Sequence, residues 1–309
     1  MKWPFFAYFT AILLLISVKT WAQSTQANPA PVYYPKCKVE KYSLESGLSN
    51  PRVKCLLEHS SGFLYVGTEF GLNRFDGYEF TVFDNTFLST PRLSGANIGR
   101  IKEIWDGQIL ITYGRGRDSF DVFNPYTLSL QVVSTKPESG FQGVLVGVTV
   151  DEARNPYLLS YTPYGLHLYA LERNFSLKKI AYIAQSMDFT KVNLSSIEFF
   201  RFRAQKLDNE TIFWVSNKVF GLLKINIQAG APVATVVHPP LHIRWKPYLW
   251  ELDKAGKLHV EEPFAHLVYP NPQQSNTVQK QATDWYACFG HMDESNNWLL
   301  AGYGATKKY

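Results

Sequence analysis

The sequence predicts an all-β fold, namely a β-propeller of four-stranded antiparallel blades, with about six blades in the chain and a ring whose closure is left open. Three observations predict it. Short apolar runs alternate with turn dipeptides over residues 47–80, a related strand recurs at the length of one propeller blade, and a polar bend precedes each recurrence. The aromatic content of 21 Phe, 18 Tyr and 8 Trp suits wedges packed between neighbouring sheets.

The first blade is predicted from Val53 to Phe83. Its four apolar runs are Val53–Leu57, Leu64–Val66, Leu72–Phe75 and Glu79–Phe83. Polar and glycine-bearing turns separate these runs, and Asp76-Gly77 is the strongest short hairpin signal among them. Because one such meander cannot bury its own faces, we expect it to recur.

The strand that ends at Gly67-Thr68 does recur. Its counterparts end near Thr112, Ser160, Ser216, Glu261 and Ala301, at steps of about 40 to 56 residues, which is the length of one blade. The alternative is a β-sandwich whose strand lengths coincide by chance. A fixed period is expected of radial repetition and not of a Greek key, so the propeller is favoured.

The first and last copies resemble the two-component regulator propeller repeat. The pattern of that family has a GLS-type lead, an E/D-x-x-G-x-L-W-I-G-T core and a G-L-N-R-F/Y-D-G tail. The matching residues are Gly47-Leu48-Ser49, Glu58, Gly62, Leu64–Thr68 and Gly71–Gly77 in the first copy, and Met292–Gly304 in the last. The middle copies have drifted, so the resemblance covers about residues 38–309 with firm anchors at the two ends. The resemblance implies that the chain is the extracytoplasmic sensor of a hybrid two-component histidine kinase, or of a related membrane-bound regulator.

Residues 1–22 are predicted to be a signal peptide. Lys2 provides the positive start, an apolar run of about 14 residues extends from Phe5 to Val18, and Thr20-Trp21-Ala22 offers small residues before a cleavage site. The competing interpretation is an uncleaved anchor, but a bilayer span needs about 20 residues. Residues 23–37 are expected to form a polar leader and residues 38–309 the propeller, in a periplasmic or secreted protein.

Closure of the ring has two interpretations. The sixth copy is expected to provide three strands that stop at Thr306–Tyr309, while Val39–Leu44 resembles an outer strand. Either Val39–Leu44 completes the sixth blade and removes an exposed edge, or the chain is truncated and further blades follow Tyr309. We expect truncation. The resemblance implies that more blades, an immunoglobulin-like module, a membrane span and output domains would follow, so membrane attachment would come only through that missing span.

Composition and motifs argue against several classes of function. The net charge of +5 is modest and no basic stripe interleaves with aromatic residues, so no nucleic-acid partner is expected. His238 and His242 straddle two prolines and cannot face each other on a helix, so we expect no metal. Glu261 and Glu262 are neighbours on a strand and point to opposite sides, so they cannot work as a carboxylate pair. We therefore expect no catalytic residue and no cofactor.

The number of cysteines is odd, so at least one thiol is expected to stay free. Cys55 lies mid-strand among apolar neighbours, where a buried thiol is the usual explanation. We predict no particular disulfide among Cys37, Cys55 and Cys288, and the oligomeric state, including a homodimer, stays open.

A binding surface is predicted at one mouth of the central channel. The turns between the second and third strands of each blade gather there, together with the connections between blades. These segments carry arginine and tyrosine side chains, which offer the bidentate hydrogen bonds and flat faces that an oligosaccharide needs. The candidate ligand-binding residues are Arg115, Arg117, Tyr113, Tyr161, Tyr164 and Glu69. For any one of them, the alternative is a solvated loop residue.

The predicted function is non-enzymatic sensing of a small-molecule or oligosaccharide ligand outside the cytoplasm, for two-component signal transduction. Two alternatives are kept. A secreted propeller lyase or hydrolase would need His, Asp or Glu side chains that converge from several inner strands. A protein-interaction scaffold would need a flat and apolar channel mouth.

Overall fold

The computed structural model describes residues 42–114, 117–184, 200–207, 210–217, 219–228, 231–238, 249–252, 257–262, 265–269, 279–282, 285–292 and 298–304. The chain divides into two compact units, Met1–Lys41 and Tyr42–Tyr309, and every described element belongs to the second. The signal peptide and the polar leader lie outside the described residues and stay predictions. Besides strands, the described residues form three short 3-10 helices: η1 (Leu44–Ser46), η2 (Trp105–Gly107) and η3 (Pro137–Ser139).

The strands form six antiparallel sheets, which we call blades 1 to 6 in chain order. Blade 1 contains β1 (Val53–Glu58), β2 (Leu64–Thr68), β3 (Gly71–Phe75) and β4 (Phe80–Phe83), and blade 2 contains β5 (Ile98–Glu103), β6 (Ile109–Tyr113), β7 (Ser119–Asn124) and β8 (Ser129–Ser134). Blade 3 contains β9 (Val144–Val150), β10 (Pro156–Thr162), β11 (Gly165–Leu171) and β12 (Leu177–Ala184). Blade 4 contains β13 (Arg201–Leu207), β14 (Glu210–Asn217), β15 (Gly221–Gln228) and β16 (Ala231–His238). Blade 5 contains β17 (Leu249–Leu252), β18 (Leu258–Glu262), β19 (Ala265–Tyr269) and β20 (Gln279–Ala282), and blade 6 contains β21 (Trp285–Met292) and β22 (Trp298–Gly304).

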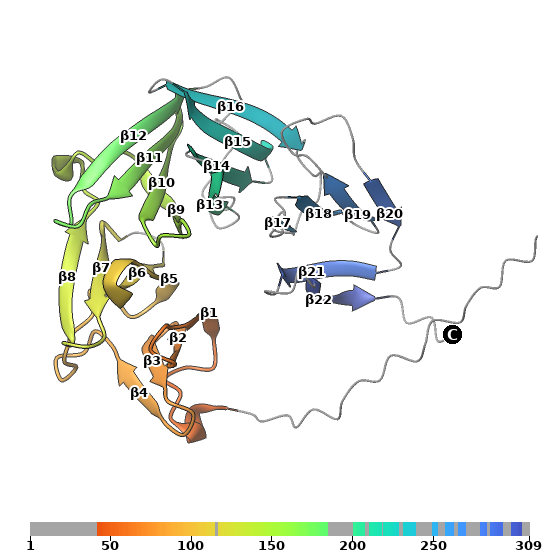
Figure 1. Ribbon diagram of the computed structural model, residues 1–309. Helices are drawn as coiled ribbons and strands as arrows, with labels where there is room; N and C mark the ends of the chain where they lie inside the picture. Colours follow the sequence, from red (N-terminus) through yellow and green to blue (C-terminus); the bar gives the residue numbers. More distant parts are fainter. Residues whose placement is uncertain are drawn as a thin grey trace, which may run out of the picture. The chain divides into compact units, whose positions relative to one another are not determined.

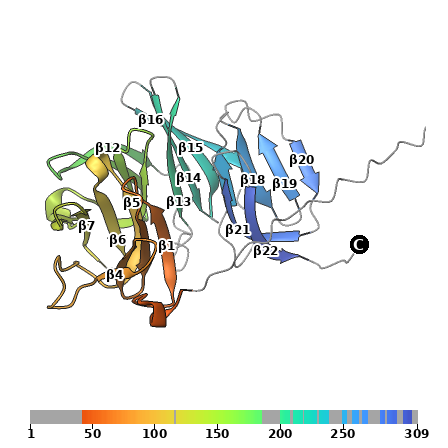
Figure 2. The same ribbon diagram turned by 60° about the horizontal axis from the view of Figure 1, so that its bottom comes forward.

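The first strands of blades 1 to 4 lie on the inner side. β1 packs on β5, β5 on β9, and β9 on β13, so the first strands of blades 1 to 4 follow one another around a common axis. Figure 1 shows these strands inside and β4, β8, β12 and β16 outside. Figure 2 shows from a second direction that blades 1 to 4 stand side by side. The prediction of a propeller with four-stranded antiparallel blades is confirmed.

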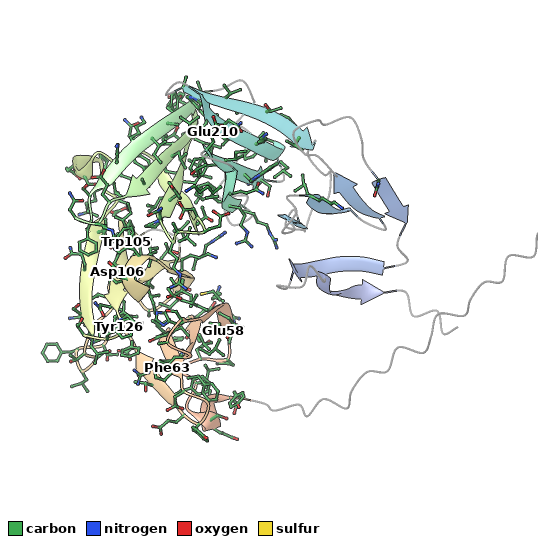
Figure 3. The ribbon with its side chains drawn as sticks, viewed as in Figure 1. Glu58, Phe63, Trp105, Asp106, Tyr126 and Glu210 are labelled. Carbon is green, nitrogen blue, oxygen red and sulfur yellow. The ribbon has the colours of Figure 1, made fainter. Side chains whose placement is uncertain are left out.

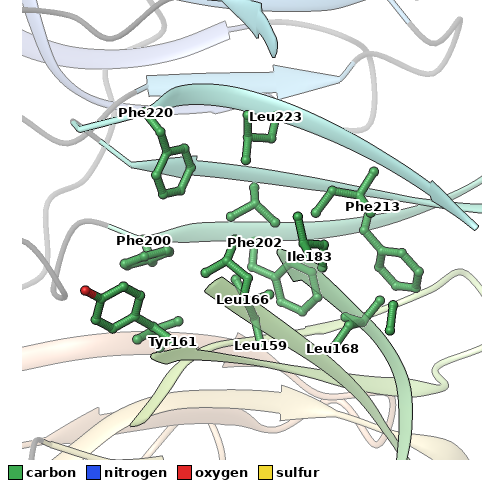
Figure 4. Packing of buried hydrophobic residues seen from close by; sticks show 14 residues of the cluster. Leu159, Tyr161, Leu166, Leu168, Ile183, Phe200, Phe202, Phe213, Phe220 and Leu223 are labelled. Atoms are coloured by element: carbon green, nitrogen blue, oxygen red, sulfur yellow. The ribbon is translucent and has the colours of Figure 1, made fainter. Parts of the chain in front are cut away.

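Apolar side chains of neighbouring blades interlock to form the core. Alternate residues of each strand face the next sheet, as the period of two requires. Between blades 3 and 4, Leu159 and Leu166 meet Phe202 and Phe213, and Figure 4 shows this packing. Burying one such side chain contributes about 1.5–3 kcal/mol. Gly147 on β9 allows the close approach, because a Cβ there would lie 2.9 Å from Cβ of Phe202.

The segment before blade 1 differs from the prediction. Val39–Leu44 was expected as a strand, but its described part, Tyr42–Leu44, leads into η1. The Ser46 hydroxyl accepts the Ser43 N–H at 3.2 Å, and this local bond favours a tight turn over an extended ladder. The Tyr42 ring packs on blade 1 instead, with its centroid 4.9 Å from that of Phe75.

Blade 6 has two strands in the described part of the chain. The third strand that the sequence predicts towards Thr306–Tyr309 lies outside the described residues, as do Val39–Lys41. Closure of the ring by an amino-terminal strand therefore stays an expectation.

Cys55 is the cysteine whose surroundings the structure describes. It is half-buried, its thiol is free, and it packs with the apolar residues between blades 1 and 2. Burial raises the pKa of this thiol to about 11. The buried thiol expected at this position is confirmed, and Cys37 and the side chain of Cys288 lie outside the described residues.

Candidate ligand-binding site

The turns between second and third strands lie at one end of the blades, together with the connections between blades. We call this the 2–3 end. An antiparallel meander reverses at each turn, so β2–β3, β6–β7 and β10–β11 turns must share an end. Two backbone hydrogen bonds join turn to connection: Gly71 N–H donates to Ala96 O, and Gly114 N–H donates to Asn97 O, both at 2.8 Å. The clustering that the sequence predicts is therefore present.

Tyr113 is half-buried at the end of β6 and is held by a carboxylate. Its hydroxyl donates to Oδ2 of Asp121, a fully buried residue on β7. Ser94, in the connection between blades 1 and 2, donates its N–H to Oδ2 at 2.8 Å and its hydroxyl to Oδ1 at 2.5 Å. Burial, together with the charge of Asp121, raises the pKa of Tyr113. Tyr113 therefore fixes the base of its loop and stays protonated.

Glu69 lies in the β2–β3 turn and forms ion pairs with Arg52 and Lys54. Its carboxylate is 3.2 Å from Lys54 Nζ and 3.3 Å from Arg52 Nη1. The hydrogen bond from Lys54 is the main cause that lowers the pKa of Glu69, with a smaller contribution from Arg52. This carboxylate can receive a ligand hydroxyl only in competition with these partners. The neighbouring Phe70 is exposed.

The two tyrosines of blade 3 differ in exposure. Tyr161 is 7% exposed and faces Phe200 across the interface with blade 4, with ring centroids 6.2 Å apart. Tyr164, in the β10–β11 turn, is 72% exposed, and its carbonyl oxygen accepts the Tyr182 hydroxyl at 2.9 Å. Tyr164 is thus the tyrosine of the predicted set that presents a ring to solvent.

The arginines of the β6–β7 loop are described in part. Arg117 is exposed, which leaves its guanidinium accessible at the 2–3 end. Arg115 lies outside the described residues. None of these placements tests ligand binding, so Arg115, Arg117, Tyr113, Tyr161, Tyr164 and Glu69 stay predicted binding residues.

The structure also reveals basic residues that sequence reasoning missed. The first strands carry Lys54 on β1, Arg100 and Lys102 on β5, and Arg203 on β13, on the side of the blades nearest the axis. Arg100 Nη2 donates to the carbonyl oxygen of Phe200 at 2.7 Å, which joins blade 2 to the start of blade 4. Burial, and then the charge of Arg203, lowers the pKa of Arg100, so two guanidinium groups lie near each other. The sequence pattern that could have revealed them is a basic residue at alternate positions of the first strand of a blade.

The opposite end of the blades carries an ionic cluster around the buried carboxylate of Glu103. Glu103 accepts the Ser60 N–H at 3.0 Å and the Ser60 hydroxyl at 2.5 Å, and it pairs with Arg154. These residues come from blades 1, 2 and 3, so the cluster ties three blades together. Figure 3 labels Phe63, Trp105, Asp106 and Tyr126, which lie in or beside the turns at this end.

The described residues add neither a metal centre nor a membrane-spanning helix to this picture. Within them, no group of three or more His, Cys, Asp or Glu side chains is placed to hold a metal ion. The same part of the chain contains no helix with the length and hydrophobicity needed to span a bilayer.

Comparison with known proteins shows a likeness of fold. No family model matches the chain, and no curated protein matches it. The extracellular domain of BT3049 from B. thetaiotaomicron, assigned to a hybrid two component system, matches 86% of this chain at 17% identity with a TM-score of 0.50. A structural genomics protein of unknown function from Bacteroides thetaiotaomicron VPI-5482 matches 82% of this chain and 67% of its own, at 9% identity and a TM-score of 0.50.

This chain spans 40% of the length of the BT3049 domain. At these identities the likeness concerns the fold alone, and it agrees with the propeller. The BT3049 domain is also of the class of protein that the repeat motif implies.

Proposed function

We propose that this chain is the sensor propeller of a two-component regulatory protein, that it works outside the cytoplasm, and that its 2–3 end binds an oligosaccharide or another hydroxyl-bearing ligand. The observation that carries the proposal is the motif at Gly47–Gly77, which resembles the regulator propeller repeat and folds as blade 1. The apolar segment at residues 5–18 supports export.

Binding would act by a shift in population between arrangements of the sensor. A ligand that prefers one arrangement shifts the equilibrium only by its difference in affinity for the two. The propeller itself would bind and not phosphorylate, so output requires a catalytic module supplied elsewhere.

The binding test is a thermal-shift screen of purified protein with neutral, uronic-acid and sulfated oligosaccharides. We expect at least one to raise Tm, and we expect Tyr164→Ala and Arg117→Ala to reduce that rise. Tyr78→Ala is the matched control, because Tyr78 is a 93% exposed tyrosine in the β3–β4 turn at the opposite end. If no oligosaccharide raises Tm, oligosaccharides are excluded as the ligand class. An Arg115→Ala variant with an unchanged response would remove Arg115 from the site.

Export and catalysis have their own tests. A fusion of residues 1–37 to alkaline phosphatase should be active, and sequencing of the mature amino terminus should show cleavage after Ala22. An inactive fusion would contradict export. Cleavage of an oligosaccharide by the purified protein, seen by chromatography, would favour the alternative of a secreted propeller lyase or hydrolase.

A further inference from the structure

One face of blade 3 changes character towards the 2–3 end. On the side facing blade 2, Leu158, Tyr169 and Leu171 belong to the apolar cluster between the two blades. The next positions towards the 2–3 end are His167 on β11 and Tyr182 on β12, which are direct cross-strand partners. A core position would normally hold an apolar residue, so a histidine here calls for an explanation.

His167 is buried and incompletely bonded. Its side chain is 6% exposed, and Nδ1 has no hydrogen-bond partner in the described part of the chain. Burial, with a contribution from the charge of Lys179, lowers the pKa of His167, so the ring is neutral near pH 7. Buried polar side-chain atoms without a partner are rare in native proteins, and each one calls for an explanation such as strain, a bound water or ion, or a functional role.

Tyr182 lies against the His167 ring. The two rings stack with centroids 4.6 Å apart and an interplanar angle of 27°. Tyr182 is 39% exposed, so it sits on the solvent side of His167. Its hydroxyl donates to the carbonyl oxygen of Tyr164 at 2.9 Å, and this exposed hydrogen bond holds the ring in place.

A glycine and polar side chains lie around the Tyr182 ring. Gly165 permits its position, because a Cβ there would clash with the Ile183 carbonyl oxygen and lie 2.9 Å from Cε2 of Tyr182. Lys179 Nζ lies 5.5 Å from the centre of the Tyr182 ring and donates to Oε1 of Gln142 at 3.1 Å. Hydrogen-bonding groups therefore surround the aromatic pair.

We propose that His167, Tyr182 and Tyr164 form a ligand subsite that Tyr182 closes in the unliganded protein. When the Tyr182 ring turns away, the face of the His167 ring that it covers is freed, so the imidazole can rotate and present Nδ1 to a hydroxyl group of a sugar-like ligand, while Lys179 and Gln142 offer further hydrogen bonds. In the closed state the Tyr182 hydroxyl bonds to Tyr164 and Nδ1 of His167 has no partner. In the open state the Tyr182–Tyr164 bond is lost and Nδ1 of His167 bonds to the ligand. The ligand class rests on the proposed function, and the closing by Tyr182 does not.

The closing is tested without any ligand, by carbethoxylation of histidines with diethyl pyrocarbonate. This reagent modifies accessible neutral imidazoles, and peptide mass spectrometry gives a rate for each histidine. His59 is the internal control, because it is 2% exposed and both ring nitrogens are engaged, with Ser61 Oγ at 2.7 Å and Gly107 O at 2.8 Å. Tyr78→Phe is the matched control variant.

Tyr182→Phe keeps the ring and removes the bond to Tyr164. We expect the His167 rate to rise about fivefold, the factor for one ordinary hydrogen bond, while the His59 rate stays constant. Tyr182→Ala should raise the His167 rate further. An unchanged His167 rate in both folded variants would overturn the closing, as would a parallel rise at His59, which would indicate general loosening.

A second arm tests the ligand class. An oligosaccharide that stabilises the wild-type protein should slow His167 modification in Tyr182→Phe and should bind His167→Phe about fivefold more weakly. If the His167 rate rises in Tyr182→Phe but no oligosaccharide stabilises the protein, the ligand class and the proposed function fail and the closing stands. If an oligosaccharide binds without protecting His167, the subsite fails and the proposed function stands.

Discussion

The hydrogen bonds to Asp121 should make a large contribution to the stability of the 2–3 end. Asp121 is fully buried and accepts three of them, two from Ser94 and one from Tyr113. A hydrogen bond to a charged group contributes about 1.5–3 kcal/mol, and a buried donor left without a partner costs about 1–3 kcal/mol. Tyr113→Phe removes one bond and its donor together, so we expect a loss of about 2 kcal/mol. Asp121→Ala removes all three bonds and strands their donors, so we expect about 4 kcal/mol or more.

Urea unfolding followed by tryptophan fluorescence measures both losses, with linear extrapolation to water. A whole domain is stable by only about 5–15 kcal/mol, so the Asp121→Ala midpoint should fall visibly. A change of less than about 0.5 kcal/mol in the free energy of unfolding of Tyr113→Phe would show that these bonds contribute little, as would an Asp121→Ala loss no larger than that of Tyr113→Phe.

The same bond predicts a dependence on alkaline pH. Burial and Asp121 raise the pKa of Tyr113 above the ordinary tyrosine value of about 10, so between the two pKa values the folded state binds more protons than the unfolded state. The stability that Tyr113 contributes is fully present below pH 10 and is lost as pH rises towards its folded pKa. Tyr113→Phe should therefore lose stability less steeply above pH 10, and parallel curves would contradict this.

Three further predictions concern other contacts. Glu103→Ala should cost about 1–3 kcal/mol in the free energy of unfolding, because it removes the carboxylate that Ser60 and the partly exposed Arg154 share, and a loss below about 0.5 kcal/mol in a urea titration would be contrary to that. Gly67→Ala should lower the free energy of unfolding by about 1–3 kcal/mol, because the added Cβ would lie 2.5 Å from Sγ of Cys55 and 2.7 Å from Cγ2 of Ile98. An unchanged Tm would show that the neighbouring side chains move aside without cost. Cys55, with a pKa of about 11, should be alkylated at pH 8 about a hundredfold more slowly in folded than in unfolded protein, as measured by peptide mass spectrometry, and equal rates would show an accessible thiol.

The blades were predictable because their signals are local. Asp76-Gly77 marks a hairpin in the sequence, and in the structure the Asp76 side chain accepts the N–H groups of Tyr78 and Glu79 at 2.8 and 2.9 Å. Strand alternation is equally local, so the repeat survives even where the motif has drifted. At Tyr42–Leu44, the described part of the segment expected as an outer strand, the bond between Ser43 and Ser46 competes with extended backbone and the chain turns into η1.

The site was less predictable, because tertiary contacts decide which loop side chains are available. Nothing next to Tyr113 in the sequence shows that its hydroxyl meets Asp121, and Arg100 contacts Phe200, 100 residues away. Nothing in the sequence around His167 marks it as buried, yet its position on β11 places it beside Tyr182. Pairing across strands and blades therefore carries information that spacing along the chain does not.

Binding of a hydroxyl-bearing ligand at the 2–3 end is the proposal on which the sensor function depends. Hydroxyl-radical footprinting with mass spectrometry tests it most directly, with a stabilising oligosaccharide added to the wild-type protein. We expect the ligand to protect Tyr164 and Tyr182 and to leave the oxidation of Tyr78 and Tyr126, at the opposite end, unchanged. Protection confined to Tyr78 and Tyr126, or none at Tyr164 and Tyr182, would contradict it.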